Sequence, residues 1–294
     1  MSTEPGAMAQ PLPQRRLGAL PVEVGAIGLG GEGILRTFGY DAQAADVINA
    51  ALDEGITYFD SARAYAGSEQ YYGATRGARR DHIFLTSKAH DRSRHGARAM
   101  LDQSLANMRI SHLDLWQLHD LRTFDELEEI SAPGGAYEAF EEAKRAGKTR
   151  YIGLTGHYDT DVLSAAIERL RFDSLLIPIN PGEGRIGGGF CHVGAKAMDL
   201  GMAVIGMKVL ARGLLTQVED PPAIQELIDY SLSQPVHIII VGCETPEQVR
   251  ANAHAARNFA PMSDERKFAL ERRLEPHVAD MLYYRPQGFD AAST

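Results

Sequence analysis

From about residue 26 onward the chain repeats one pattern: a short apolar run, a polar or glycine-containing loop, and a segment of helical spacing. Each apolar run is too short for a helix and is rich in Ile, Val, Leu or aromatic residues, as expected for strands that are covered on both faces. The predicted strands are 26–30, 57–60, 83–87, 113–118, 151–154, 175–179, 203–207 and 237–241.

The segments between these strands place apolar residues on one face of a helix. Leu101, Leu105 and Met108 lie at i, i+4 and i+7, and similar spacing recurs in 163–170 and 224–232. Alternating strands and helices predict βα units with parallel strands. Because eight such units fit into 294 residues, the pattern favours an α/β fold closed as a (β/α)8 TIM barrel over an open sheet.

The ends of the chain predict less regular structure. We expect a flexible N-terminal segment, residues 1–16, and then a single barrel domain over residues 17–294. Within that domain, residues 17–25 predict a short hairpin and residues 263–277 an extra C-terminal helix.

Two predicted loops are longer than a plain βα connection requires. Residues 120–135 follow the fourth predicted strand, and the glycine-rich residues 180–189 follow the sixth. Long loops at the C-terminal ends of barrel strands usually shape the active site, but a tolerated surface insertion is as good an explanation of either loop alone.

A glycine-rich segment near the start supports a rival fold. Residues 28–33 match G-x-G-x-x-G, and Asp60 closes the next strand, as a ribose-binding acid would in a Rossmann domain. In that domain the third glycine opens a helix, whereas here helical spacing begins only near Asp41. We therefore interpret the segment as a turn beneath a ligand, with Gly30 and Gly31 close to it.

Composition narrows the classes of partner and compartment. The net charge of −9, with Lys and Arg scattered singly, argues against nucleic acid or an anionic membrane as the main partner. The two cysteines suggest no disulfide framework, and no apolar run is long enough to span a membrane. We expect a cytoplasmic protein that binds a small molecule and no metal; its oligomeric state stays open.

Three consecutive predicted strands end in an ionisable residue. These residues are Asp60, Lys88 and His119, and Tyr65 follows Asp60 by five positions. In a barrel the strand ends converge at one mouth, where the chemistry takes place. Each residue alone has an ordinary structural explanation, such as a helix cap or a packed loop. Four of them at these positions indicate a catalytic group.

The residue types suit proton delivery to a carbonyl group. An ammonium near Tyr65 favours the phenolate, so Lys88 is expected to lower the pKa of Tyr65 below its usual value near 10. Asp60 would hold Lys88 in place. A neutral His119 can donate a hydrogen bond to a carbonyl oxygen, and Tyr65 can protonate the alkoxide that forms as a hydride arrives.

These motifs resemble the aldo-keto reductase superfamily over nearly the whole chain, from about residue 17 to 258. Phe59-Asp60-x4-Tyr65 with 67–69, Lys88, and His119 in 115–119 resemble the family's catalytic tetrad, and 147–153 resembles its fifth-strand entry. Residues 206–210 are similar to a bacterial branch. The resemblance implies reversible hydride transfer between NADP(H) or NAD(H) and a small aldehyde or ketone.

A phosphate site is predicted beyond the eighth strand. Thr245 suits a helix N-cap, Pro246 the first helical position and Gln248 a capping box, so a helix N-terminus would face the mouth. Such an N-terminus favours a phosphate, and Lys208 closes the neighbouring strand. The bland alternative is that every helix has an N-terminus and most of them bind only water.

The resemblance extends to the cofactor contacts, with departures. Where the family often places a cation against a 2′-phosphate, this chain has Glu244, which puts the usual preference for NADP in doubt. Met207 stands where an aromatic residue often stacks on the nicotinamide, and no glutamine occupies the sixth strand. The residues expected at the cofactor are Gly30, Gly31, Thr155, Gly156, His157, Asn180, Lys208, Val209, Leu210, Arg212, Gly242, Cys243, Glu244, Thr245, Gln248 and Asn252.

The sequence leaves other functions open beside a carbonyl reductase. The departures at the cofactor would also suit a catalytically weak sensor or regulatory protein of the same fold. An unrelated barrel enzyme could use Lys88 as a Schiff base, although Asp60 nearby should keep Lys88 charged.

Overall fold

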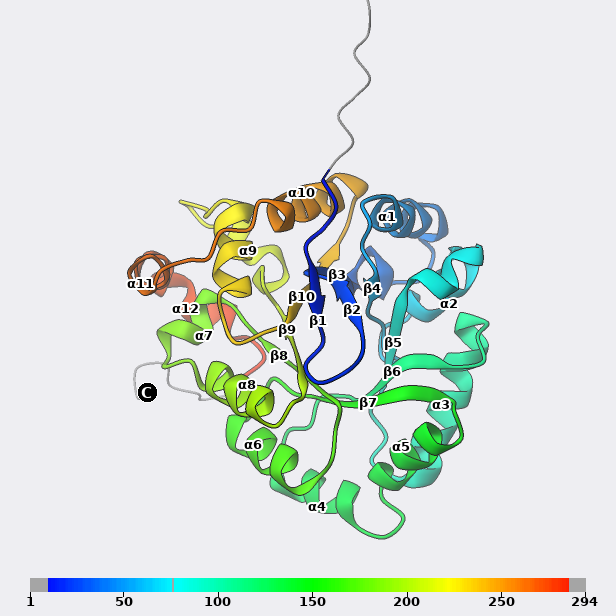
Figure 1. Cartoon of the computed structure of the whole chain (residues 1–294). Coiled ribbons are helices and arrows are strands. Elements are labelled where there is room, and N and C mark those ends of the chain that lie inside the picture. The colour runs from blue at the N-terminus through cyan, green and yellow to red at the C-terminus, as the bar shows by residue number, and fades with distance from the viewer. Residues whose placement is uncertain (1–9, 76, 286–294) are drawn as a thin grey trace, which may run out of the picture.

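Eight parallel strands form a closed barrel in the order β10-β3-β4-β5-β6-β7-β8-β9, with helices around its outside (Figure 1). The structure is a computed structural model and describes residues 10–75 and 77–285. The barrel strands are β3 (Ile27–Gly33), β4 (Tyr58–Phe59), β5 (Phe84–Ala89), β6 (Leu113–Leu118), β7 (Thr149–Thr155), β8 (Ser174–Pro178), β9 (Ala203–Met207) and β10 (Ile238–Cys243). This arrangement confirms the predicted (β/α)8 barrel.

The helices follow the strands in the βα order that the spacing predicted. The α-helices are α1 (Asp41–Asp53), α2 (Ser68–Thr75), α3 (Arg94–Met108), α4 (Phe124–Ser131), α5 (Ala136–Arg145), α6 (Thr160–Arg169), α7 (Pro181–Arg185), α8 (Gly189–Asp199), α9 (Ile224–Leu232), α10 (Pro246–Arg257), α11 (Asp264–Arg273) and α12 (Val278–Met281). The 3-10 helices are η1 (Ile34–Arg36), η2 (Gly77–His82), η3 (Ala211–Thr216) and η4 (Glu275–His277). Among the described residues, no helix is both long and apolar enough to cross a membrane.

The glycine-rich segment of the rival fold lies in a strand. β3 continues through its last glycine, and Gly33 pairs with Cys243 of β10. A Rossmann turn would open a helix at that glycine. The closed barrel therefore excludes that alternative.

A short hairpin lies at the N-terminal ends of the barrel strands, where its β1 (Gln14–Arg16) and β2 (Glu23–Gly25) pair in antiparallel register. Leu17 and Val24 are buried against residues of the barrel interior, among them Tyr58 and Ile205. The prediction that residues 1–16 are flexible is thus wrong for Gln14–Arg16, because pairing with β2 and the burial of Leu17 anchor the first arm. Residues 1–9 lie outside the described residues.

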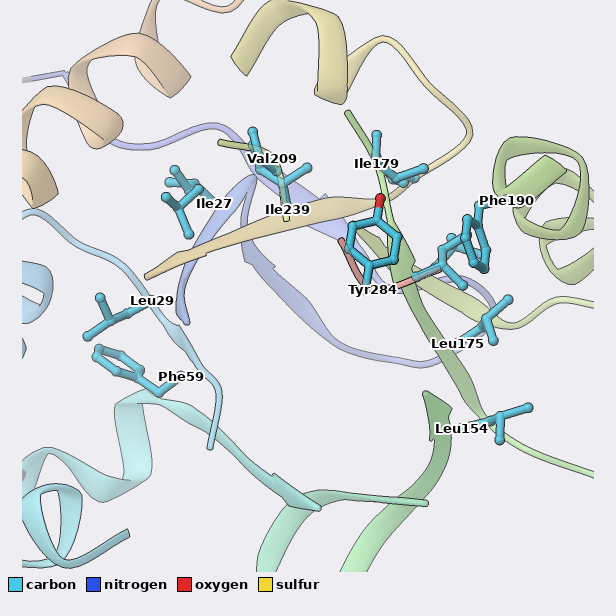
Figure 2. Close-up of a cluster of buried hydrophobic side chains, with 14 of the residues drawn as sticks. Ile27, Leu29, Phe59, Leu154, Leu175, Ile179, Phe190, Val209, Ile239 and Tyr284 are labelled. Carbon is cyan, nitrogen blue, oxygen red and sulfur yellow. The ribbon is translucent and has the colours of Figure 1, made fainter. Parts of the chain in front are cut away.

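The main core lies between the barrel and its surrounding helices. Leu101 and Met108 of α3 are buried there, and Trp116 of β6 stacks on Phe140 of α5 with ring centroids 3.8 Å apart. Figure 2 shows Tyr284, near the end of the described chain, among other buried side chains of this core that include Ile179 and Phe190. The tail, residues 282–285 of the described chain, is therefore part of the packed structure.

Candidate active site

A cavity of about 1570 Å³ opens at the C-terminal ends of the barrel strands. Lys88 at the end of β5, Thr155 at the end of β7 and Met207 at the end of β9 all contribute to its wall. Its volume exceeds the roughly 300–1,000 Å³ of ordinary small-molecule pockets, so a cofactor and a substrate fit together.

The cavity floor holds a buried ion pair. Lys88 Nζ lies 2.5 Å from Asp60 Oδ2 and donates a second hydrogen bond, of 2.8 Å, to the carbonyl oxygen of Ser61. Thr86 Oγ1 donates to the other carboxylate oxygen of Asp60 at 3.0 Å. Each charge is thus hydrogen-bonded, as a buried pair needs in order to offset its loss of hydration.

Tyr65 and His119 lie over this pair and complete the predicted group. Lys88 Nζ is 5.1 Å from the centre of the Tyr65 ring, and the rings of Tyr65 and His119 meet edge to face with centroids 5.9 Å apart. All four predicted residues, Asp60 included, line the same cavity.

Burial decides the protonation states of Tyr65 and His119. Desolvation raises the pKa of Tyr65 well above its usual value, and the nearby carboxylates of Asp60 and Glu32 raise it further. The expectation that Lys88 would lower the pKa of Tyr65 is therefore wrong for this state of the protein. Burial, and next Lys88, hold the pKa of His119 well below its usual value, so its imidazole is neutral at neutral pH.

An arginine that the sequence did not single out holds His119 in place. Arg92 donates to the carbonyl oxygen of His119 at 2.9 Å and to that of Asp120 at 2.6 Å. The amide of His119 donates to the carbonyl oxygen of Ala89 at 2.8 Å. These contacts fix the backbone on both sides of the imidazole.

Most of the residues expected at the cofactor line the cavity. They are Gly30, Gly31, Thr155, His157, Lys208, Val209, Leu210, Arg212, Gly242, Glu244, Gln248 and Asn252. A Cβ on Gly31 would lie 2.7 Å from the carbonyl oxygen of Asp60 and 2.8 Å from the Tyr65 ring. That position therefore has to be glycine for the backbone to form the wall.

The other residues expected at the cofactor do not line the cavity. A Cβ on Gly156 would meet Leu163, which is buried in the core, and Thr245 caps α10 by accepting from the amide of Gln248 at 3.4 Å. Cys243 is buried, and burial raises the pKa of its thiol to about 12. None of these side chains contributes to the cavity lining, so we no longer expect cofactor contacts from them.

Asn180 also has a structural role. Its Oδ1 caps α7 by accepting from the amide of Glu183 at 3.2 Å, and its Nδ2 donates to the hydroxyl of Tyr284 at 3.1 Å and to the carbonyl oxygen of Lys208 at 3.3 Å. Because these bonds occupy both ends of its amide, Asn180 joins β8, β9 and the tail and lies outside the cavity lining.

Two features of the cavity were not predicted. Glu32 forms ion pairs with Arg36 at 2.9 Å and with Arg212 at 3.5 Å, so it joins the loops that follow β3 and β9. Tyr283 lines the mouth with its ring 4.8 Å from the guanidinium of Arg212 and 5.5 Å from Lys208 Nζ. The neighbouring G-x-G-x-x-G match marked the first loop, but nothing in the sequence pointed to the tail.

The fold and this cavity define an oxidoreductase class. The model of the Aldo/keto reductase family matches residues 22–228, and the chain belongs to that family. Over 89% of this chain and 94% of its own length, L-galactose dehydrogenase of Arabidopsis thaliana is 28% identical to it.

Two solved structures share the fold. The holo form of an aldo-keto reductase from Bacillus halodurans matches with a TM-score of 0.72 and 21% identity, over 92% of this chain and 96% of its own. An aldo-keto reductase from Klebsiella pneumoniae in complex with NADPH matches with a TM-score of 0.72 and 22% identity, over 90% and 95%. These structures share the fold of the chain, and its family makes it an oxidoreductase.

Proposed function

We propose that this enzyme reversibly reduces a small aldehyde or ketone to an alcohol, with Tyr65 as the general acid. The observation that carries the proposal is the buried Lys88–Asp60 pair beneath Tyr65 and His119 in one large cavity. The nicotinamide cofactor, when bound, supplies or accepts the hydride.

Each of the four residues has a separate role in moving the proton. Neutral His119 donates a hydrogen bond to the carbonyl oxygen and orients it. Tyr65, held protonated by its burial, gives its proton to the developing alkoxide. Lys88, fixed by Asp60, then stabilises the phenolate that remains.

The cavity wall fits a dinucleotide. Gly30 approaches β10 so closely that a Cβ there would lie 3.0 Å from the amide nitrogen of Gly242, which leaves a backbone surface without side chains. The N-terminus of α10 and the cations Lys208 and Arg212 border the same cavity and suit a pyrophosphate. We propose that these residues hold the cofactor.

The substitution Tyr65→Phe tests the acid role. We expect it to lower kcat with a small aldehyde by at least about a hundredfold, the usual contribution of a general acid, while a fluorescence titration gives unchanged NADPH affinity. Retained turnover would contradict the role of Tyr65. Tight cofactor binding by the native protein, with no turnover of any aldehyde or ketone, would instead favour the sensor alternative.

We also propose that NADH is accepted about as well as NADPH. Glu244 lines the cavity in the loop that precedes α10, and its amide donates to Gln248 Oε1 at 2.7 Å. A carboxylate there repels a 2′-phosphate and can accept from a ribose hydroxyl. The substitution Glu244→Lys should raise NADPH affinity about tenfold relative to NADH. An unchanged ratio of the two affinities would remove Glu244 from cofactor discrimination.

A further inference from the structure

A buried carboxylate that the proposed reaction does not use lies next to the loop that carries Tyr65. It belongs to Glu69, in the first turn of α2, which is 0% exposed and does not line the cavity. A charge that has lost its hydration is stable inside a protein only when other groups bind it. The partners of Glu69 therefore show which parts of the fold this carboxylate connects.

Three donors from three different elements bind Glu69. Ser87 of β5 donates its hydroxyl to Oε1 at 2.7 Å, and Asn107 of α3 donates its amide to Oε2 at 2.8 Å. Arg63 Nη1 forms an ion pair with the same Oε2. Both oxygens are thus occupied, so one carboxylate connects β5, α3 and the loop of residues 61–67.

The contacts of Glu69 lie on both sides of Tyr65. Arg63 precedes Tyr65 by two residues and Glu69 follows it by four, so their ion pair closes the loop around the phenol. Ser87 directly precedes Lys88, and the amide of Arg63 donates to the carbonyl oxygen of Lys88 at 3.1 Å. Glu69 therefore fastens the loop that carries the phenol to the strand that carries the ammonium.

The charge of this contact makes it a strong constraint on the loop. Tyr65 itself is held by a neutral hydrogen bond, in which its amide donates to the carbonyl oxygen of Ala62 at 3.0 Å. Hydrogen bonds between charged groups, such as that of Arg63 to Glu69, are roughly twice as strong as neutral ones. Loss of the carboxylate should therefore let the phenol move relative to Lys88.

We infer that Glu69 is a positioning residue, which fixes the phenol of Tyr65 at the distance from Lys88 that proton transfer requires. Lys88 Nζ lies 5.1 Å from the centre of the Tyr65 ring, and its attraction for a phenolate weakens as this separation grows. Because Glu69 does not line the cavity, its effect should fall on turnover and leave cofactor affinity unchanged. The inference rests on the proposed carbonyl reduction.

The substitution Glu69→Gln keeps the size of the side chain and removes its charge. Its amide nitrogen then faces at least one of the three donors. Because a misplacement of about 1 Å at a reacting group can cost about a hundredfold, we expect kcat with propanal to fall at least about tenfold, with unchanged NADPH affinity. The milder Ser87→Ala removes a single donor and should lower kcat about threefold. If Glu69→Gln does not fold, a native kcat in Ser87→Ala overturns the inference.

A double-mutant cycle separates positioning from a general structural role. In a Tyr65→Phe background there is no phenol to position, so Glu69→Gln should change the remaining turnover by less than about twofold. An equal tenfold loss in both backgrounds would overturn the inference, because Glu69 would then act by some route other than Tyr65.

Asp114→Asn is the matched control for losing a buried carboxylate. Asp114 is also buried, forms ion pairs with Arg80 at 2.7 Å and Arg150 at 2.9 Å, and accepts from the amide of Leu85 at 2.9 Å. It does not line the cavity. Its substitution should lower the thermal midpoint and leave kcat within about twofold of native, at a temperature where circular dichroism shows each variant folded. A tenfold loss of kcat here too would overturn the inference.

Failure of the proposed reaction would look different, since the native protein would turn over no aldehyde, or Tyr65→Phe would stay active. NMR of protein labelled with ¹³Cζ-tyrosine then decides the inference, with the Tyr65 signal identified by its absence from Tyr65→Phe. We expect this signal to shift or broaden in Glu69→Gln and to stay in place in Asp114→Asn. A Tyr65 signal that moves in neither variant, or equally in both, overturns the positioning role of Glu69.

Discussion

Burial gives the two central residues of the active site opposite pKa shifts that serve the same reaction. Tyr65 keeps its proton because desolvation raises its pKa, and His119 stays neutral because desolvation lowers its pKa. A protonated phenol and a neutral imidazole are the states that a carbonyl reductase needs at neutral pH. In the proposed reaction, the folded cavity therefore prepares the acid before a substrate arrives.

His157 makes the free energy of unfolding depend on pH. Burial, and next Lys208, lower its pKa to about 4 in the folded state from near 6.5 when unfolded, so the unfolded chain binds this proton first as the pH falls. The contribution of neutral His157 to the free energy of unfolding is complete above pH 6.5 and is lost as the pH falls toward 4. Between pH 7 and pH 4.5 the native protein should lose about 2 kcal/mol more of its free energy of unfolding than His157→Gln does.

Urea unfolding of both proteins at the two pH values measures this difference. The other histidines and the carboxylates are the same in the two proteins, so the contributions of those that do not contact His157 cancel. Parallel losses would show that His157 is not held neutral in the folded state.

At the scale of elements, the short helix α7 connects the tail to the barrel. Glu183 of α7 is buried, and burial raises the pKa of its carboxyl. The Tyr284 hydroxyl donates to Glu183 Oε1 at 2.7 Å, and Arg285 forms an ion pair with the same carboxylate. Through these contacts one carboxylate fixes the segment that carries Tyr283 to the cavity mouth.

Removing the guanidinium of Arg285 from this contact should lower the free energy of unfolding. In Arg285→Met the buried carboxylate loses its counterion, and we expect the free energy of unfolding to fall by about 3 kcal/mol. Arg185→Gln is the matched control, because Arg185 lies on α7 with Glu183. Its ion pair with Glu275 is exposed and should contribute less than about 1 kcal/mol. Denaturant unfolding compares them, and equal losses would contradict a buried anchor.

The sequence predicted the helices and strands better than it predicted the contacts between them. Every barrel strand was found, because strands that are buried on both faces leave continuous apolar runs. Residues 180–189 were predicted as a loop, although Asn180 followed by Pro181 already signals a helix start. The glycines of this segment are typical of a loop, so the helix was not predicted.

At the scale of the whole molecule, the two ends of the barrel differ in what they do. The hairpin packs Leu17 and Val24 against the strand starts, whereas the loops and the tail build the cavity at the strand ends. The four residues proposed as catalytic were predictable as a cluster because strand ends converge in any such barrel. Arg92 and Arg63 were not predictable from the sequence. They bind backbone and side-chain atoms that come close to them only in the folded chain.

The same limit explains the wrong sign of the Tyr65 pKa shift. Sequence spacing shows which charges come close together, but desolvation depends on how completely the closed barrel covers a side chain. Asn180 and Cys243 were placed at the cofactor for a similar reason. Their positions along the chain adjoin the cavity, while their side chains are used for capping and for core packing.

The raised pKa of both thiols has a practical consequence. The chain has 2 cysteines, and burial raises the pKa of both Cys191 and Cys243 to about 12. Both thiols are therefore protonated at neutral pH, so alkylating reagents should react slowly with either. A single cysteine introduced on the exposed surface would therefore accept a maleimide dye selectively. Cofactor binding at the mouth could then be followed by fluorescence with both native cysteines left in place.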